Sequence, residues 1–183
     1  YKMTELKLTQ FIIPVVVLLI ITASYISYSR KVSEKNVFNK LILKISSLAF
    51  FLNLVWEIAQ GPLYSGYVYD LNHISFCALA SVADMLMVLL LYFAFSLFYK
   101  DPYWLGRMTI SNVISLVLIG GIGAILGELR HLAAGSWSYS DAMPLLPYVE
   151  VGLSPVLQFM ILPTLIFYLG RLSIKKVNEV DSP

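Results

Sequence analysis

Five mostly apolar stretches dominate this sequence, and each is long enough to cross the ~30 Å hydrocarbon core of a bilayer as a helix. They run over residues 8–28, 41–60, 73–99, 105–129 and 147–169. Backbone N–H and C=O groups find no water inside a bilayer, so runs of this length indicate helices that satisfy their own hydrogen bonds. The sequence therefore predicts an all-α, polytopic transmembrane bundle of about five spans that forms one domain over residues 1–183.

Composition supports the same conclusion and excludes several classes of partner. Hydrophobic residues make up 58% of the chain and charged residues only 13%, whereas soluble domains carry about 25% charged residues. The net charge of +2 and the lack of a basic run give no expectation of a nucleic-acid partner. Cys77 is the single cysteine, so no cysteine-based metal or redox motif is expected, and no cofactor either. The first span lacks a following small-residue cleavage site, which predicts that it is retained.

The basic residues predict the orientation of the spans. Ten of the 13 Lys and Arg residues fall on one side: Arg30, Lys31, Lys35, Lys40, Lys44, Lys100, Arg107, Arg171, Lys175 and Lys176. Lys2, Lys7 and Arg130 fall on the other. Cytoplasmic loops carry the excess of Lys and Arg, so we expect the N-terminus outside and the C-terminus in the cytoplasm. A multi-pass protein of the bacterial inner membrane fits this pattern.

The second span carries a polar stripe. Asn53, Trp56, Glu57 and Gln60 follow the spacing i, i+3, i+4, i+7, which places them on one face of a helix. A charge at the bilayer centre costs at least about 2.5–3.5 kcal/mol on insertion scales, so intramembrane acids indicate a functional site. The alternative is that Glu57, near the outer end of its span, only reaches out to water.

The third span carries a second stripe, formed by His73, Cys77, Ser81 and Asp84. Asp84 lies about eleven residues from the outer end, which is ~16 Å along a helix and close to mid-membrane. Its short side chain cannot reach either interface, so Asp84 is the strongest single functional candidate. A structural, hydrogen-bonded acid between helices is the alternative.

The fourth span ends in an acid and a histidine. Glu128 follows several glycines and forms a Glu-x-x-His pair with His131. Metal-binding bundles carry this pair in duplicate with further carboxylates, whereas this chain has one copy. A metal site built from Glu57, Asp84, Glu128, His131 and His73 is chemically feasible, but we assign no metal. Glu128 could equally anchor the helix end at the interface.

The fifth span contains Pro155, which we expect to kink or break the helix. Glu150, Ser154 and Gln158 follow the spacing i, i+4, i+8 and are expected on one face. This pattern is typical of a lined cavity, or of an ordinary kinked helix with Glu150 at the interface.

The two outer loops are rich in aromatic residues: Tyr64, Tyr67 and Tyr69 in one, and Trp137, Tyr139 and Tyr148 in the other. They could form an interfacial aromatic belt or the entrance to a site in the outer leaflet. Together with the acids, they predict a funnel with an acidic, aromatic mouth and with Asp84 at its floor. The inner half of the bundle is expected to be apolar.

The stretch Asn53-Leu-Val-Trp56-Glu57 resembles the Asn-x-x-Trp-Glu stretch of the small integral-membrane terpene cyclases. The resemblance covers one helix and implies that Glu57 is a proton donor to a polyene epoxide. In that family the partner aspartate lies in a final span, whereas the final span here has none. Only Asn53, Trp56 and Glu57 are carried over.

These observations favour an intramembrane acid–base enzyme that acts on a lipid or isoprenoid substrate in an outer-leaflet cavity. Its catalytic candidates are Glu57, Asp84 and Glu128. Its substrate-binding candidates are Asn53, Trp56, Gln60, His73, His131, Glu150 and Gln158. A proton- or cation-coupled transporter or channel, and an accessory subunit with structural acids, remain as alternatives. Membrane lipids and a hydrophobic small molecule are the expected partners, and the sequence does not indicate an oligomeric state.

Overall fold

The computed structural model describes residues 12–180, with side chains for residues 12–172. Five α-helices form this part of the chain: α1 (Ile12–Lys31), α2 (Lys35–Gln60), α3 (Leu71–Tyr99), α4 (Ile110–Ala133) and α5 (Leu153–Val180). All five are long and apolar enough to cross a membrane, so the prediction of an all-helical, multi-pass membrane protein is confirmed. Leu8, Lys2 and Lys7 lie outside the described residues, as do the side chains of Lys175 and Lys176.

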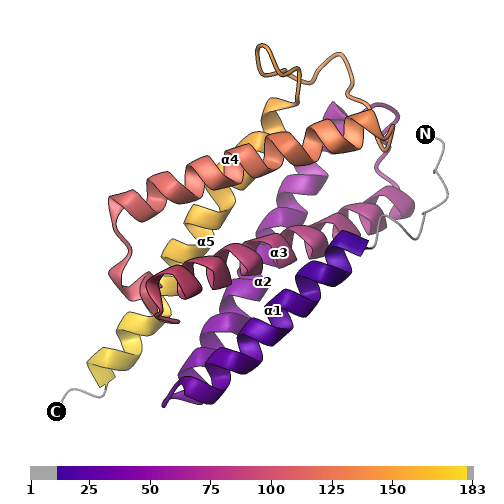
Figure 1. Cartoon of the computed structure of the whole chain (residues 1–183). Coiled ribbons are helices and arrows are strands. Elements are labelled where there is room, and N and C mark those ends of the chain that lie inside the picture. The colour runs from indigo at the N-terminus through magenta and orange to yellow at the C-terminus, as the bar shows by residue number, and fades with distance from the viewer. Residues whose placement is uncertain (1–11, 181–183) are drawn as a thin grey trace.

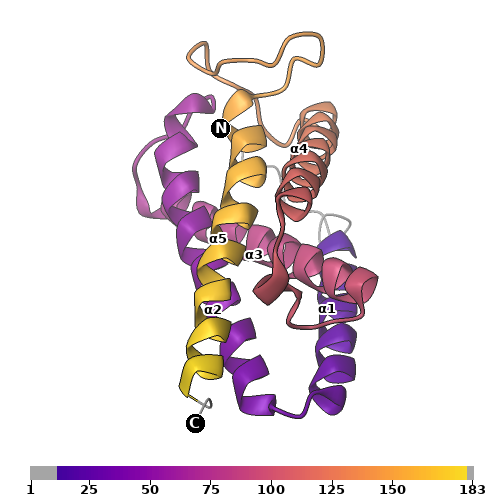
Figure 2. The same ribbon diagram turned by 90° about the vertical axis from the view of Figure 1, so that its left-hand side faces the viewer.

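The five helices form a bundle in which α2 is central. It packs against α3 and α5, while α4 packs mainly on α5 and α1 mainly on α3. The helices α2 and α5 run side by side, whereas α3 crosses them at a steep angle (Figures 1 and 2). The crossing brings the middle of α3 close to the last turns of α2, which determines where the polar residues meet.

Local sequence determines where the helices begin and end. Asp70 caps α3 by accepting a hydrogen bond from the backbone N–H of His73. Thr109 and Asn112 form a capping box at the start of α4, because each side chain accepts a bond from the other's backbone N–H. The helix α3 ends at Tyr99, and the following residue, Lys100, caps it in a left-handed conformation with φ 54°. These caps satisfy backbone groups that a helix end otherwise leaves without partners.

The predictions of a helix over Glu150 and of a kink at Pro155 are wrong. The helix α5 begins at Leu153, so Pro155 is in its first turn, where a proline replaces an N–H group that has no intrahelical partner. Glu150 precedes the helix in an exposed loop with φ 53°. It therefore does not share a helical face with Ser154 and Gln158.

The proline that interrupts α5 is Pro163. A proline has no N–H group, so the carbonyl oxygen of Phe159, one turn earlier, loses its usual helical partner. Gly120 of α4 packs directly over this oxygen, and a Cβ atom at Gly120 would collide with it. The contact allows the backbones of α4 and α5 to approach closely.

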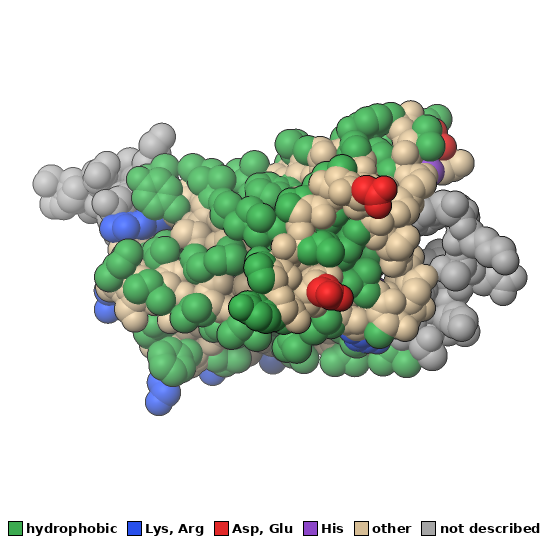
Figure 3. Space-filling view, turned by 90° about the horizontal axis from the view of Figure 1, so that it is seen from above, with side chains coloured by type: hydrophobic (Ala, Val, Ile, Leu, Met, Phe, Trp, Pro, Cys, Tyr) green, Lys and Arg blue, Asp and Glu red, His purple; other side chains and the backbone are tan. Residues whose placement is uncertain are grey.

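Apolar and polar residues segregate along the bundle. The large buried cluster is entirely hydrophobic, and among its members are Phe38, Tyr92, Phe93, Trp104 and Phe167. Figure 3 shows a face covered largely by hydrophobic side chains. On this face most Lys and Arg side chains lie toward the end at which Figure 1 draws the C-terminus, and the Asp and Glu side chains lie toward the other end.

Candidate functional site

The side-chain amide of Gln158 lies at the centre of a polar network between α2, α3 and α5. Its Nε2 atom lies 2.9 Å from Asn53 Oδ1, 3.1 Å from Glu57 Oε1 and 3.1 Å from Asp84 Oδ2. Gln158 and Asn53 are each only 1% exposed. The network therefore joins one residue of α5 to both acids of the neighbouring spans inside the helical bundle.

Gln60 and Ser154 extend this network toward the end of α2. Gln60 Nε2 donates to Glu57 Oε1 at 2.9 Å and to Gln158 Oε1 at 3.0 Å. The Ser154 hydroxyl donates to Gln60 Oε1 at 2.9 Å. Asn53 donates back to the carbonyl of Ala49, one turn earlier in α2. These bonds fix the orientations of both glutamine amides.

The amide of Gln158 shares its acceptors with the amide of Gln60. The Nε2 atom of Gln158 carries two hydrogens and faces three acceptor oxygens, of which Glu57 Oε1 also receives an N–H of Gln60. Each of the three oxygens can therefore have one donor. The Glu57 and Asp84 carboxyl groups are close enough to share a hydrogen bond. Two ionised carboxylates this close repel each other, which favours a proton shared between them, and we describe Glu57 and Asp84 as the carboxyl pair.

Glu128 has a different environment from the carboxyl pair. Its Oε2 atom accepts hydrogen bonds from the Tyr139 hydroxyl and, at 3.2 Å, from the indole N–H of Trp137. The side chain is buried, at 8% exposure. Two donors aimed at one oxygen stabilise the ionised carboxylate, whereas burial of the side chain opposes ionisation. Glu128 thus has two donors of its own, whereas Glu57 and Asp84 share the amide of Gln158.

Aromatic side chains from two loops, the one after α2 and the one after α4, surround Glu128. The Tyr64 ring lies 5.6 Å from the Tyr139 ring and 6.1 Å from the Trp137 ring, measured between centroids. Burial raises the pKa of Tyr64 above its usual value, and the nearby charges of Glu128 and Glu57 raise it further. Burial and the bond to Glu128 likewise raise the pKa of Tyr139, so its phenol stays protonated and donates to Glu128. Tyr64 lies near both Glu128 and the carboxyl pair.

Backbone contacts hold these two loops together. Tyr64 and Tyr139 form an antiparallel bridge, and Ser65 N–H donates to the Ser138 carbonyl at 2.9 Å. The Ser65 hydroxyl donates to the Tyr139 carbonyl at 2.6 Å. Ser140 adds a backbone bond to Leu63. The pairing of the loops therefore positions the aromatic rings on Glu128.

The structure brings some of the predicted site residues together and leaves others apart. Asn53, Glu57, Gln60, Asp84 and Gln158 form one network. The sequence predicts that Asp84 lies deeper in the membrane than Glu57. Their side chains nevertheless meet, because α3 crosses α2 at a steep angle and both carboxyl groups reach the side-chain amide of Gln158. Glu128 lies in the neighbouring aromatic group.

Four other candidates lie outside the network. Glu150 is exposed in the loop before α5. Trp56 packs against the hydrophobic core, and its indole N–H is buried with no hydrogen-bond partner among the described residues. His131 stacks on Trp137 with ring centroids 4.2 Å apart. Within residues 12–172, no group of three or more His, Cys, Asp or Glu side chains is arranged to hold a metal ion.

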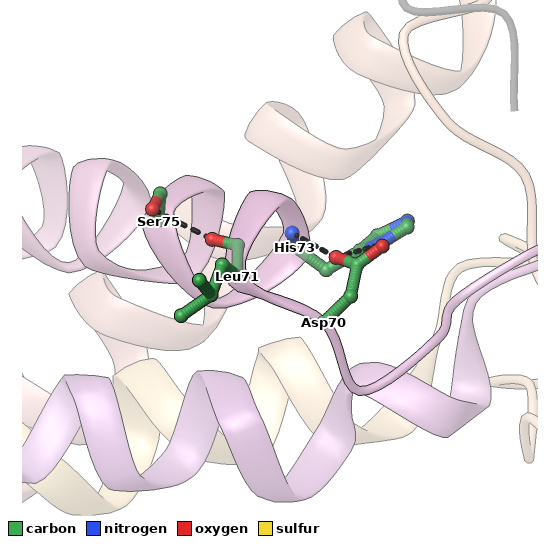
Figure 4. A network of polar contacts seen from close by, with 4 residues as sticks. All are labelled: Asp70, Leu71, His73 and Ser75. Carbon is green, nitrogen blue, oxygen red and sulfur yellow. Dashed lines mark hydrogen bonds and ion pairs between the residues drawn. The ribbon is translucent and has the colours of Figure 1, made fainter.

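His73, the fourth, lies at the first turn of α3 next to Asp70 (Figure 4). Its Nδ1 atom is 2.8 Å from Asp70 Oδ1, the same oxygen that accepts the His73 backbone N–H. These bonds hold the pKa of the Asp70 carboxyl below its usual value, with the backbone N–H as the largest cause. In Figure 4 Ser75 donates to the Leu71 carbonyl on the same turn. The contacts shown for His73 thus belong to the cap of α3.

The sequence patterns do not identify Tyr64, Trp137, Tyr139 and Ser154 as residues of the site. They indicate that the aromatic loops could form an entrance, but sequence spacing does not show that the loops pair. Comparisons with protein-family models, with curated proteins and with solved structures found no match.

Proposed function

We propose that this protein is an intramembrane acid–base enzyme that isomerises or cyclises a lipid or isoprenoid substrate. The observation that carries the proposal is the contrast between its buried acids. Glu57 and Asp84 lie close enough to share a proton, whereas Glu128 lies apart from them and accepts two hydrogen bonds. Buried acids in two different environments suit general acid–base catalysis, in which one acid donates a proton and another accepts one.

The proposed reaction leaves the mass of the substrate unchanged. The carboxyl pair donates its proton to an alkene carbon or an epoxide oxygen, and a cation develops on the substrate. A proton leaves a neighbouring carbon and is accepted by Glu128, which completes an isomerisation. The rings of Tyr64, Trp137 and Tyr139 stabilise the cation. The resemblance of Asn53, Trp56 and Glu57 to the membrane terpene cyclases supports the choice of an isoprenoid.

A hydrophobic substrate suits the surroundings of the site. The helices expose large apolar side chains, among them Val55, Leu79 and Leu126. An apolar groove of about 410 Å³ lies between α4 and α5, lined by residues such as Val117, Met160 and Tyr168; it extends from the middle of the bundle toward the basic end, and none of its lining residues belongs to the polar network. A substrate dissolved in the bilayer can approach from the side, and no aqueous channel is needed.

The test is conversion of a polyprenyl epoxide or polyene by purified protein in lipid nanodiscs prepared in D2O. From the polyene we expect a rearranged product with one solvent deuterium on the protonated carbon, and from the epoxide a hydroxyl product isomeric with the substrate, because a deuteron on oxygen exchanges with water. Glu57→Gln, Asp84→Asn and Glu128→Gln should each slow turnover at least about 100-fold, the usual contribution of a general acid or base.

Asp141→Asn is the matched control, because Asp141 is an exposed acid in the loop after α4. It should retain full activity. If Glu57→Gln and Asp84→Asn fold stably and keep wild-type turnover, the acids have no catalytic role. If both variants only lose stability, the acids are structural and the accessory-subunit alternative holds.

We further propose that the basic end of the bundle faces the cytoplasm of a bacterial inner membrane, with the N-terminus outside. The excess of Lys and Arg supports this orientation. In a Cys77→Ala background, Ser138→Cys in the outer loop should react with a membrane-impermeant maleimide on intact cells, and Lys40→Cys should not. The reverse pattern would refute the orientation. The only partners proposed are membrane lipids and the substrate.

A further inference from the structure

The helix α1 lies at the edge of the bundle (Figures 1 and 2), and only one of its faces is covered. Val17, Ile21 and Tyr28 are its buried residues. Apolar side chains on its other faces, such as Leu19 at 64% exposure, have only lipid to contact in a membrane. Lipid therefore surrounds most of α1.

A surface hollow of about 520 Å³ runs along the uncovered face of α1. It is lined by Ala23, Ile26, Ser27, Arg30 and Lys31. Their spacing of i, i+3, i+4, i+7 and i+8 places them in one stripe, about 12 Å long at the helical rise. Apolar side chains come first, then a hydroxyl group, then two cations at the end of the helix. We call this surface the α1 hollow.

The two cations of the α1 hollow are available to an external anion. Both are exposed. The ion pairs within residues 12–172 are His73–Asp70 and Arg107–Asp101, so neither Arg30 nor Lys31 has a carboxylate partner there. Glu34, the acid nearest to them in sequence, occupies the N-cap position of α2 without a side-chain cap bond and is itself exposed.

We infer that the α1 hollow binds one anionic phospholipid from the leaflet at the basic end of the bundle. The order of side chains along the stripe matches the order of groups in such a lipid. Arg30 and Lys31 hold the phosphate through charge-assisted hydrogen bonds, Ser27 donates to the phosphate or glycerol oxygens, and an acyl chain lies on Ile26 and Ala23. Clustered juxtamembrane cations attract anionic lipid, and the hollow gives one molecule a fixed position.

This inference does not depend on the proposed enzymatic function. The hollow is formed by α1 alone, whereas the carboxyl pair, Gln158 and Glu128 belong to α2, α3, α4 and α5. Variants of the hollow leave every residue of the polar network in place. Loss of lipid binding and loss of catalysis can therefore be measured separately.

The test is native mass spectrometry of the full chain, titrated in detergent with phosphatidylglycerol or with phosphatidylcholine of the same acyl chains. We expect one phosphatidylglycerol to bind in preference to phosphatidylcholine. Arg30→Gln/Lys31→Gln should weaken the affinity of that first molecule about 30-fold, at about fivefold per cation. Lys35→Gln/Lys40→Gln is the matched control, because it removes two exposed cations from α2 at the same end. It should change the affinity less than about twofold.

Three outcomes would overturn the inference. The first is equal binding of the two lipids to the wild type. The second is an equal loss of affinity in both double variants, which would mean that only net charge matters. The third is displacement of the bound lipid by millimolar inorganic phosphate, which would mean that the cations bind the phosphate ion and not a lipid. Unchanged gel-filtration profiles and melting temperatures verify that the variants are folded.

Discussion

At the scale of single residues, the amide of Gln158 links the two acids of the carboxyl pair. Its two N–H hydrogens face oxygens of Asn53, Glu57 and Asp84 at a position that is 1% exposed. A buried acceptor without a donor costs about 1–3 kcal/mol. We infer that Gln158 positions the acids and satisfies their oxygens; its contact with a substrate stays a prediction.

We predict that Gln158→Leu lowers the free energy of unfolding by about 2 kcal/mol or more, because at least two buried oxygens lose a donor. Reversible unfolding in mixed detergent micelles measures this quantity. Thr164→Val, two turns away on α5, is the control, since its hydroxyl only makes a 3.5 Å contact with Met160 O of its own helix. Adding Asp84→Asn to Gln158→Leu should restore part of the stability, because the new amide brings its own N–H donors. Equal effects of Gln158→Leu and Thr164→Val would refute the role of the network.

Helical spacing predicted the residues of this network but not their surroundings. The stripe Asn53–Glu57–Gln60 and the deep Asp84 followed from periodicity within one helix. That Gln158 meets both acids depends on the angle at which α3 crosses α2, which no local pattern encodes. The pairing of Tyr64 with Tyr139 joins two loops that are distant in sequence, so the donors of Glu128 were not assigned to the site.

At the scale of the elements, the contact between α4 and α5 depends on Gly120 and Pro163. The proline leaves the Phe159 carbonyl oxygen without its helical donor, and Gly120 lies against that oxygen. The effect of a proline depends on its position in the helix, which explains why the predicted kink at Pro155 is wrong. A proline is easily accommodated in a first turn and disruptive in a helix interior, and the sequence alone did not reveal that α5 begins at Leu153.

We predict that Gly120→Ala destabilises the bundle by about 1–3 kcal/mol, the usual cost of overpacking, because its Cβ atom would meet a backbone oxygen that cannot turn aside. Gly123→Ala is the matched control on the same helix, where a Cβ atom meets nothing within 4 Å. It should be neutral or slightly stabilising, since alanine favours the helix. The melting temperatures of both variants in one detergent measure the difference. If the two variants melt together, close packing at Gly120 does not limit stability.

At the scale of the whole molecule, the polar network lies on one side of a dry core. Beyond Asn53 and Asp84, toward the basic end, the large cluster of buried side chains includes Ala49, Ile45, Val88, Leu162 and Ile166. The buried hydroxyl of Ser96 donates to the carbonyl of Tyr92. A proton pathway needs a chain of polar groups or waters, and a water needs two to four polar partners. The buried polar side chains of this half, among them Ser96 and Asn112, make local contacts, and no hydrogen bond described within residues 12–172 links them to Asp84.

We therefore predict that the protein does not conduct protons across a membrane. The test uses proteoliposomes that contain the wild type and a pH-sensitive dye, with a pH gradient imposed across the membrane. Valinomycin and potassium are present in these and in protein-free liposomes. The proteoliposomes should lose the gradient no faster than the protein-free liposomes. Asp84→Asn should leave this slow rate unchanged while it abolishes turnover of the isoprenoid. A gradient that collapses with the wild type and persists with Asp84→Asn would instead assign the carboxyl pair to proton-coupled transport. Because the two measurements use the same variant, they separate a proton that is delivered to a substrate from one that crosses the bilayer.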